Sequence, residues 1–205
     1  MLKFFYASGT CAMAPHIVLE QLGCPHEAVR LDFSRNEQQS PDYLKVNPKA
    51  RVLALVTERG VITETPALLL YLAQRYPEGG LAPLDDLFVL AQAQAFNSYL
   101  CSTVHVAHAH RRRGTRWVDD EAALESMQRR VAQNMTECFD LIERDLLQGP
   151  WVLGDRLSIC DAYLFTVTQW LPGDSVDVSR FAKVADHQRR MADLPAVQRV
   201  KALHA

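Results

Sequence analysis

The hydrophobic positions in the first third of the chain alternate between two periods. Segments in which apolar residues recur every two residues predict strands, and segments in which they recur every three to four residues predict helices. Gly23 and Pro25 end the first helix, residues 34–39 are polar and loop-like, and Arg59-Gly60 turns a hairpin. The predicted elements, in chain order, are a strand at 3–6, a helix at 15–22, a strand at 27–31, a short helix at 41–46, strands at 52–57 and 61–63, and a helix at 65–76.

The pattern changes after residue 77, where prolines and glycines interrupt the periodic runs up to Pro83. Every later apolar run has helical spacing, and the predicted helices lie at 84–110, 119–147, 159–170, 178–191 and 196–203. We therefore predict an α/β domain at 1–77, a linker at 78–86 and an all-helical domain at 87–205. The βαβαββα order of the first domain is that of a thioredoxin-like fold.

One helix start in the second domain carries a specific signal. Ser158 occupies the N-cap position, and Asp161 follows three residues later. Such a pair forms a capping box, in which each side chain bonds a backbone N–H of the other residue, and an acidic first turn suits the helix dipole. This motif indicates a fold, not an activity.

Composition excludes several classes of function. The 205 residues include 22 basic and 24 acidic side chains, a balance without the general basic footprint of a nucleic-acid-binding protein. No apolar run reaches the ~20 residues that span a membrane, and the apolar start of the chain is too short for a signal peptide. The five cysteines are scattered without a Cys-x-x-Cys pair, so we expect reduced thiols in a cytoplasmic protein rather than disulfides or a zinc site.

The stretch 47–67 resembles the glutathione-binding half of a glutathione transferase. An Asn47-Pro48 loop leads into the predicted hairpin, and Glu64-Thr65 stands where the family has Glu-Ser. The segments around Cys11, His105 and Ser158 resemble the family in the same order, so the resemblance covers nearly the whole chain and is closest to the bacterial beta class. It implies the glutathione transferase fold, glutathione as co-substrate and a homodimer.

Leu53 is the main departure from the family, which has a proline there after a cis peptide bond. In the family this bend lets the backbone of the preceding residue, here Val52, pair with the cysteinyl part of glutathione like an added strand. Because a cis bond before a residue other than proline costs roughly 2.5–4 kcal/mol, we expect a trans Val52–Leu53 bond and an altered site. The alternative is that ligand binding retains the strained geometry.

Cys11 is the leading catalytic candidate. It follows the first strand and precedes the Ala14-Pro15 helix start, where backbone N–H groups are expected to lower the pKa of its thiol. By resemblance to the beta class, it would lie close to the glutathione sulfur. The hydroxyls of Ser8 and Tyr6 are rivals, since other classes use a hydroxyl near this loop, and a purely structural cysteine is the further alternative.

Glu64 and Thr65 lie at a strand-to-helix corner, where the N–H groups of a helix start can hold an anion. By resemblance this corner binds the γ-glutamyl end of glutathione. The other interpretation is an N-cap with Pro66 at the first helical position, and both can hold together.

The helix after the linker carries the remaining glutathione candidates. By resemblance His105 faces the active site, and Ser98 and Ser102 contact glutathione. A register shifted by one residue would instead use Asn97, with Val104 at the histidine position. The His105/His108 pair has metal-binding spacing, but no carboxylate or cysteine cluster completes it, so we expect no metal.

Arginines follow these histidines at positions 111–113 and 116. We interpret this run as a solvated helix end, where positive charge suits the dipole. The alternative is a wall of the substrate site that favours anionic electrophiles. Trp117, Trp151 and Trp170 are interpreted as core or interface aromatics rather than a ligand platform.

The predicted function is conjugation of reduced glutathione to a small hydrophobic electrophile, with Cys11 and helix-start N–H groups stabilising the glutathione thiolate. One alternative is a thiol reductase or thioltransferase in which Cys11 attacks mixed disulfides. The other is a non-catalytic binding protein that kept the fold, as the Leu53 departure suggests.

Overall fold

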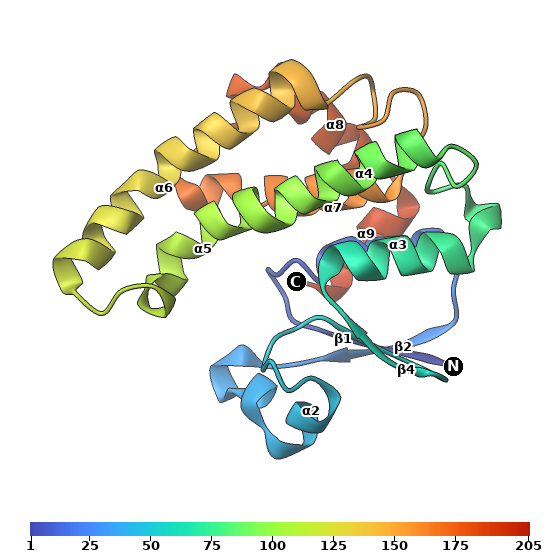
Figure 1. The fold of residues 1–205 in the computed structure, drawn as a ribbon, viewed down its shortest axis with the longest axis horizontal. Helices are drawn as coiled ribbons and strands as arrows, with labels where there is room; N and C mark the ends of the chain where they lie inside the picture. The colour runs from blue at the N-terminus through green and yellow to red at the C-terminus, as the bar shows by residue number, and fades with distance from the viewer.

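The computed structural model describes all residues, 1–205, and Figure 1 shows a sheet with the helical half of the chain stacked above it. The elements of the first half are β1 (Leu2–Tyr6), α1 (Met13–Gln21), β2 (His26–Arg30), the short 3-10 turns η1 (Phe33–Arg35) and η2 (Glu37–Gln39), α2 (Pro41–Val46), β3 (Ala54–Thr57), β4 (Gly60–Thr63), α3 (Thr65–Arg75) and the 3-10 turn η3 (Pro77–Gly79). This order confirms the predicted thioredoxin-like arrangement. The polar stretch 34–39, predicted as loop, forms η1 and η2.

The sheet has the strand order β2-β1-β3-β4. β1 runs parallel to β2, with Phe4 opposite Ala28, and antiparallel to β3, with Phe4 opposite Leu55. β3 and β4 form the predicted hairpin. α3 lies on the face that meets the helical half and α2 lies beyond the opposite face (Figure 1), while α1 packs against α3 and α7. The sheet thus presents the loop after β1 and the corner after β4 to the helices.

The second half is entirely helical. Its elements are α4 (Leu87–Tyr99), the π-helical turn η4 (Leu100–Val104), α5 (His105–Arg113), the 3-10 turn η5 (Gly114–Arg116), α6 (Glu121–Leu141), the π-helical turn η6 (Ile142–Leu146), α7 (Ile159–Thr168), the 3-10 turns η7 (Leu171–Asp174) and η8 (Val178–Arg180), α8 (Ala182–Ala192) and α9 (Pro195–Leu203). None of these helices is both long and apolar enough to cross a membrane.

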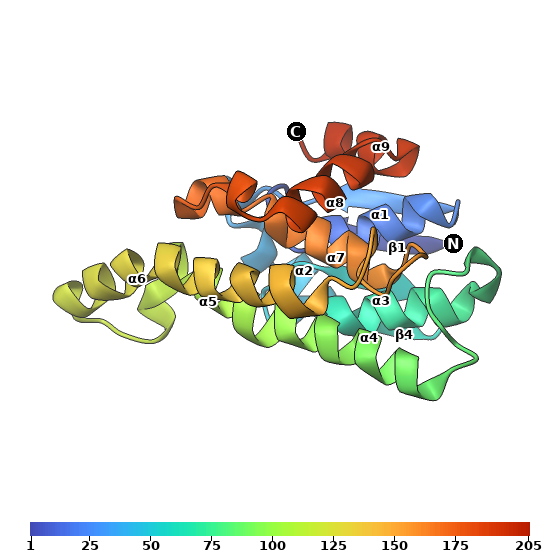
Figure 2. The same cartoon turned by 90° about the horizontal axis from the view of Figure 1, so that it is seen from above.

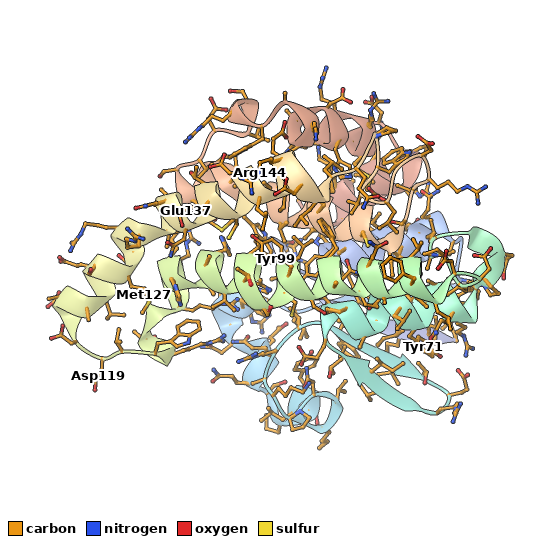
Figure 3. The ribbon with its side chains drawn as sticks, turned by 45° about the horizontal axis from the view of Figure 1, so that its top comes forward. Tyr71, Tyr99, Asp119, Met127, Glu137 and Arg144 are labelled. Carbon is orange, nitrogen blue, oxygen red and sulfur yellow. The ribbon has the colours of Figure 1, made fainter.

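α4, η4 and α5 form one long rod, and α6 returns alongside it in the opposite direction. Figure 3 shows Tyr99 of the rod pointing towards α6, where its hydroxyl donates to the Cys138 carbonyl at 3.4 Å. The labelled Met127, Glu137 and Arg144 mark the course of α6 and η6 back over the rod (Figure 3). The far end of the rod, α5, packs against α6 and faces the sheet domain across a cavity.

α7 is the centre of the helical half, and all ten of its residues are buried. Seen from above, it lies between α4 and α8 (Figure 2), and it contacts both. Its predicted capping box is confirmed, because the Ser158 N–H donates to the Asp161 carboxylate at 2.7 Å and Ser158 Oγ accepts from the helix. A polar start thus fixes one end of an otherwise apolar helix.

The end of the chain returns to the sheet domain. α9 packs on α1, and the Tyr6 hydroxyl donates to the Leu203 carbonyl at 3.2 Å. Beside it, the buried rings of His16 and His204 share a hydrogen bond of 2.9 Å between Nδ1 and Nε2. These contacts join the last helix to the first strand and helix.

The Val52–Leu53 peptide bond is cis, so the expected trans geometry is wrong. The prediction weighed only the local preference of the bond. In the fold, the Leu53 side chain is buried in the core, and the ladder to β1 begins only at Ala54. Val52 therefore stays outside the ladder.

Candidate functional site

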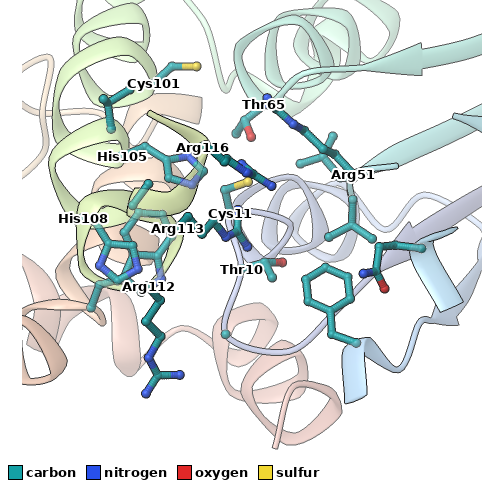
Figure 4. Close-up of a pocket in the computed structure, with 18 of the residues that line it drawn as sticks. Thr10, Cys11, Arg51, Thr65, Cys101, His105, His108, Arg112, Arg113 and Arg116 are labelled. Atoms are coloured by element: carbon teal, nitrogen blue, oxygen red, sulfur yellow. The ribbon is translucent and has the colours of Figure 1, made fainter. Parts of the chain in front are cut away.

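A cavity of about 790 Å³ lies where α5 meets the sheet domain. This volume falls within the roughly 300–1,000 Å³ of small-molecule sites. Its walls come from the loop after β1, the loop before β3, the β4–α3 corner and the far end of the helical rod. Figure 4 shows Cys11 between the helix that carries His105 and His108 and the opposite wall that carries Thr65 and Arg51.

Cys11 lines this cavity with 9% of its surface exposed. Its carbonyl accepts from the Ala14 N–H at the start of α1, as the helix-start position requires. Burial raises the pKa of the Cys11 thiol, outweighing the lowering by a hydrogen bond with Thr65 and by the charge of Arg113. The expected lowering of this pKa is therefore wrong, because loss of water disfavours the thiolate more than its polar neighbours stabilise it.

The rival hydroxyls differ in position. Ser8 lines the cavity, and its buried hydroxyl has no partner in the chain. The Tyr6 ring instead stacks on His204, and its hydroxyl is directed to the end of α9 rather than to the cavity. The geometry therefore keeps Ser8, and not Tyr6, beside Cys11.

Thr65 begins α3, is almost fully buried and lies against Cys11. Glu64, the residue before it, has φ 74°, a left-handed conformation that a residue other than glycine adopts at a cost. No side chain caps α3, because the Glu64 carboxylate pairs with Lys49 instead. The first N–H groups of α3 therefore have no side-chain partner and remain suited to an anion.

Two side-chain hydrogen bonds fix the backbone of the loop before β3. The Arg51 carbonyl accepts from Asn47 Nδ2 at 2.6 Å and from the Tyr43 hydroxyl at 2.7 Å. These bonds hold the following Val52 and Leu53 at the cavity wall. Since Val52 precedes the ladder, its backbone offers an edge to which an extended ligand can add.

His105 lines the cavity from the helical side. Burial lowers the pKa of His105 to about 4, with further lowering by His108 and by nearby arginines, so the imidazole is neutral at pH 7. Its ring and that of His108 both pack on Trp170, at centroid distances of 4.9 and 4.4 Å. His108 also bonds Asp174 at 2.7 Å.

The π-helical turn η4 lies directly before His105 and contains Cys101. Both Cys101 and His105 line the cavity. Val104, the alternative to His105, is buried in the core, and Asn97 is buried outside the cavity lining. Such turns occur frequently at functional sites.

Ser98 and Ser102 are not brought to the cavity. Both are exposed, and the Ser102 hydroxyl donates to the Ser98 carbonyl at 2.8 Å. Their expected contacts with glutathione stay predictions that the cavity of a single chain does not support.

Several lining residues were interpreted differently in the sequence. Arg112, Arg113 and Arg116 line the cavity and do not form only a solvated helix end; the first two lie in the last turn of α5, and Arg116 lies in η5. Trp117 and Trp170 line it too, although they were interpreted as core or interface aromatics. The spacing gave part of the signal, since 105, 109 and 112 recur every three or four residues and share one face of α5, whereas Arg116 lies beyond the end of that helix.

This arrangement combines a thiol, an uncapped helix start and an open backbone edge in one cavity. Together they suit an extended, acidic, peptide-like ligand, with its anionic group at the helix start and its backbone paired along Val52.

Comparison with known proteins shows which family this chain resembles. Residues 2–74 match the glutathione S-transferase N-terminal domain, and residues 109–200 match the glutathione S-transferase C-terminal domain. The chain is 29% identical to glutathione S-transferase GstA of Escherichia coli O157:H7, over 96% of each chain.

Solved structures are similar over the whole length. A glutathione transferase homologue from Sulfitobacter, with bound glutathione, is 42% identical with a TM-score of 0.96, over 99% of this chain and 98% of the other. The bacterial beta class glutathione S-transferase of Sphingomonas chungbukensis is 27% identical with a TM-score of 0.86, over 99% and 98%. The chain therefore belongs to the glutathione S-transferase family.

Proposed function

We propose that this chain conjugates reduced glutathione to a small electrophile. The observation that carries the proposal is the placement of Cys11 and Thr65 in one cavity with the uncapped start of α3. The similarity to a homologue that contains glutathione supports the same ligand.

Glutathione would lie along the wall of the sheet domain. Its γ-glutamyl carboxylate would bind the N–H groups at the start of α3, with the Thr65 hydroxyl and Glu64 beside it. Its cysteinyl backbone would pair with Val52, next to the buried Leu53. This orientation puts the glutathione sulfur close to Cys11.

Cys11 would act as a hydrogen-bond donor rather than as a thiolate. Because burial raises the pKa of its thiol, Cys11 keeps its proton at neutral pH and can donate it to the glutathione thiolate. His105, neutral at pH 7, would contribute a hydrogen bond and not a charge.

The chemical step is a displacement or an addition at the electrophile. Glutathione enters this step as a thiolate, because its thiol has already released its proton to solvent. The thiolate sulfur then forms a bond to an electrophilic carbon. In a displacement, the leaving group departs with the electron pair of the bond that breaks. In an addition, the π bond breaks, and its electron pair moves to the neighbouring atom, which then takes up a proton from solvent. Hydrogen bonds aimed at the thiolate lower its pKa and raise the fraction of reactive sulfur at neutral pH.

Thiol–disulfide exchange is the second candidate, because Cys101 lines the same cavity as Cys11. Exchange requires an attacking thiolate, and the raised pKa of Cys11 makes that the weaker of the two proposals.

Cys11→Ala tests the proposal directly. With reduced glutathione and 1-chloro-2,4-dinitrobenzene, we expect kcat to fall by about tenfold or more, while the Kd for glutathione changes by less than about threefold. Cys138→Ala is the matched control, since Cys138 is a buried free thiol that does not line the cavity. Unchanged turnover and binding in Cys11→Ala would remove Cys11 from the mechanism.

The alternatives give different results. A Cys11 adduct after treatment with oxidised glutathione, together with turnover of glutathionylated substrates, would favour exchange. Saturable glutathione binding without turnover of any electrophile would favour a non-catalytic binding protein.

We also propose a cytoplasmic homodimer that acts in detoxification, with a two-fold interface between the sheet domain of one copy and the helices of the other. Sedimentation at several concentrations tests the dimer, and a single species with the mass of one chain would contradict it.

A further inference from the structure

Four arginines line the cavity without any partner in the chain. They are Arg51, Arg112, Arg113 and Arg116. No carboxylate lies within ion-pair distance of any of the four, and none of their side chains takes part in a hydrogen bond. Arg111, by contrast, approaches the buried Asp174 at 3.7 Å, so the same run contains both paired and unpaired cations.

The cavity has almost no negative charge to balance them. Glu64 is its only lining carboxylate, and that carboxylate already pairs with Lys49. The chain as a whole carries a net charge of −2. The positive charge is therefore concentrated at this cavity and is not a general property of the surface.

Three of these arginines reach the cavity from both halves of the chain. Arg51 comes from the loop before β3, Arg113 from the end of α5 and Arg116 from η5. The charges of Arg113 and Arg51 contribute to the lowered pKa of Arg116, whose main cause is burial. Figure 4 shows Arg113 and Arg116 beside Cys11, with Arg51 on the opposite wall. An anion bound between them would relieve this repulsion.

Aromatic rings share the cavity with the arginines. Trp117 and Trp170 line the helical side, and the His108 ring stacks on Trp170 with an interplanar angle of 20°. Flat aromatic groups pack well against such rings, and guanidinium groups bind planar carboxylates with two parallel hydrogen bonds. The lining thus combines a surface for a planar group with cations for an acid.

Resting on the proposed conjugation, we propose that the second substrate is an anionic electrophile: a planar aromatic or conjugated molecule whose carboxylate is bound by Arg113 and Arg116. This reverses the interpretation of the arginine run as a solvated helix end. The planar part lies against Trp117, and the electrophilic carbon faces the glutathione sulfur at Cys11.

Glutathione itself is another source of carboxylate. Its γ-glutamyl carboxylate has a site at the start of α3, and its glycyl carboxylate can reach Arg51, which directly precedes Val52. Arg113 and Arg116 project from the opposite, helical wall. The test must therefore separate the acid of the electrophile from the acid of glutathione.

A matched pair of electrophiles makes this separation. 4-Chloro-3,5-dinitrobenzoate and its methyl ester share the ring and the leaving group and differ in charge. In the double variant Arg113→Gln/Arg116→Gln, kcat/KM for the acid should fall by roughly tenfold to a hundredfold, and that for the ester should change by less than about threefold. The KM for glutathione should stay the same.

Two further variants refine the interpretation. Arg116→Lys keeps the charge but loses the planar fork, so it should lose only part of the preference for the acid. Arg130→Gln is the control, because this exposed arginine on α6 bonds Gln133 and lies outside the cavity. It should keep the full preference. Circular dichroism checks that each variant is folded.

Two results would overturn the proposal. An equal loss for acid and ester with a raised KM for glutathione would mean that these arginines bind the glycyl carboxylate. An unchanged preference for the acid would mean that the arginines are only solvated.

A binding measurement separates this proposal from the conjugation itself. 3,5-Dinitrobenzoate lacks the leaving group, and quenching of tryptophan fluorescence reports its binding near Trp117 and Trp170. We expect it to bind about tenfold or more tightly than its methyl ester at low salt, with the difference shrinking at high salt and absent from the double variant. Preferential binding without turnover of either electrophile would leave the anion site intact and contradict the conjugation. Turnover without a preference for the acid would support the conjugation and contradict the anion site.

Discussion

The carboxylate of Asp161 should stabilise the helical half more than any other single polar group. It is fully buried at the start of α7. One oxygen accepts from the Ser158 N–H at 2.7 Å and from the Ser158 hydroxyl at 2.8 Å. The other accepts from the Val152 N–H at 2.7 Å and from His187 Nε2 at 3.0 Å. Four hydrogen bonds from three parts of the chain thus meet on one side chain.

Asp161→Asn removes half of this arrangement without changing its shape. An amide has one acceptor oxygen and one NH₂ group, so one pair of donors must face another donor whichever way the side chain turns. Each hydrogen bond to a charged acceptor contributes about 1.5–3 kcal/mol, and breaking a buried pair costs about 3–5 kcal/mol. We therefore expect the free energy of unfolding to fall by about 3–5 kcal/mol.

Equilibrium unfolding in urea, followed by circular dichroism at one fixed protein concentration, measures this loss. Ser158→Ala is the matched control, because it removes the hydroxyl but keeps the carboxylate, and it should cost only about 1 kcal/mol. A loss below about 1 kcal/mol in Asp161→Asn would refute the reasoning, since it would mean that the carboxylate is not the point that fixes α7.

The remaining predictions concern pH and glutathione. Burial lowers the pKa of His16 to about 3 and that of His204 to about 4, so both rings are neutral in the fold and bind protons only after unfolding. Stability should be flat above about pH 7 and fall from about pH 6.5 towards pH 4, by up to about 2 kcal/mol per ring at about pH 5, in urea unfolding at each pH. The double variant His16→Phe/His204→Phe should flatten this profile, and an unchanged slope would contradict the assignment. Thr65→Val should raise the calorimetric Kd for glutathione by up to about tenfold while Thr65→Ser changes it little, and equal affinities in both variants would exclude a role for the hydroxyl.

Much of the fold follows from sequence patterns that act locally. The switch from a two-residue to a helical repeat predicts the order of strands and helices, and Ser158 with Asp161 predicts a helix start to the residue. Both signals depend on contacts between neighbours in the chain. They are therefore readable without knowing the tertiary structure.

What the sequence did not predict depends on contacts between distant segments. The pKa of Cys11 is set mainly by its burial between the two halves of the chain, and the Val52–Leu53 bond is cis against the local preference of a bond that does not precede proline. The arginines after His105 resemble a solvated helix end in the sequence, whereas the end of α5 and η5 bring them to the cavity beside the sheet domain. Helix periodicity alone gives no sign of the π-helical turn η4 directly before His105.

Calorimetric titration of the reduced protein with reduced glutathione tests the central claim most directly. Binding through the start of α3 and the Val52 backbone predicts a saturable isotherm, with a Kd between about 1 μM and a few mM. The absence of saturable binding in that range would contradict the account, because the cavity around Cys11 and Thr65 would then serve a different ligand.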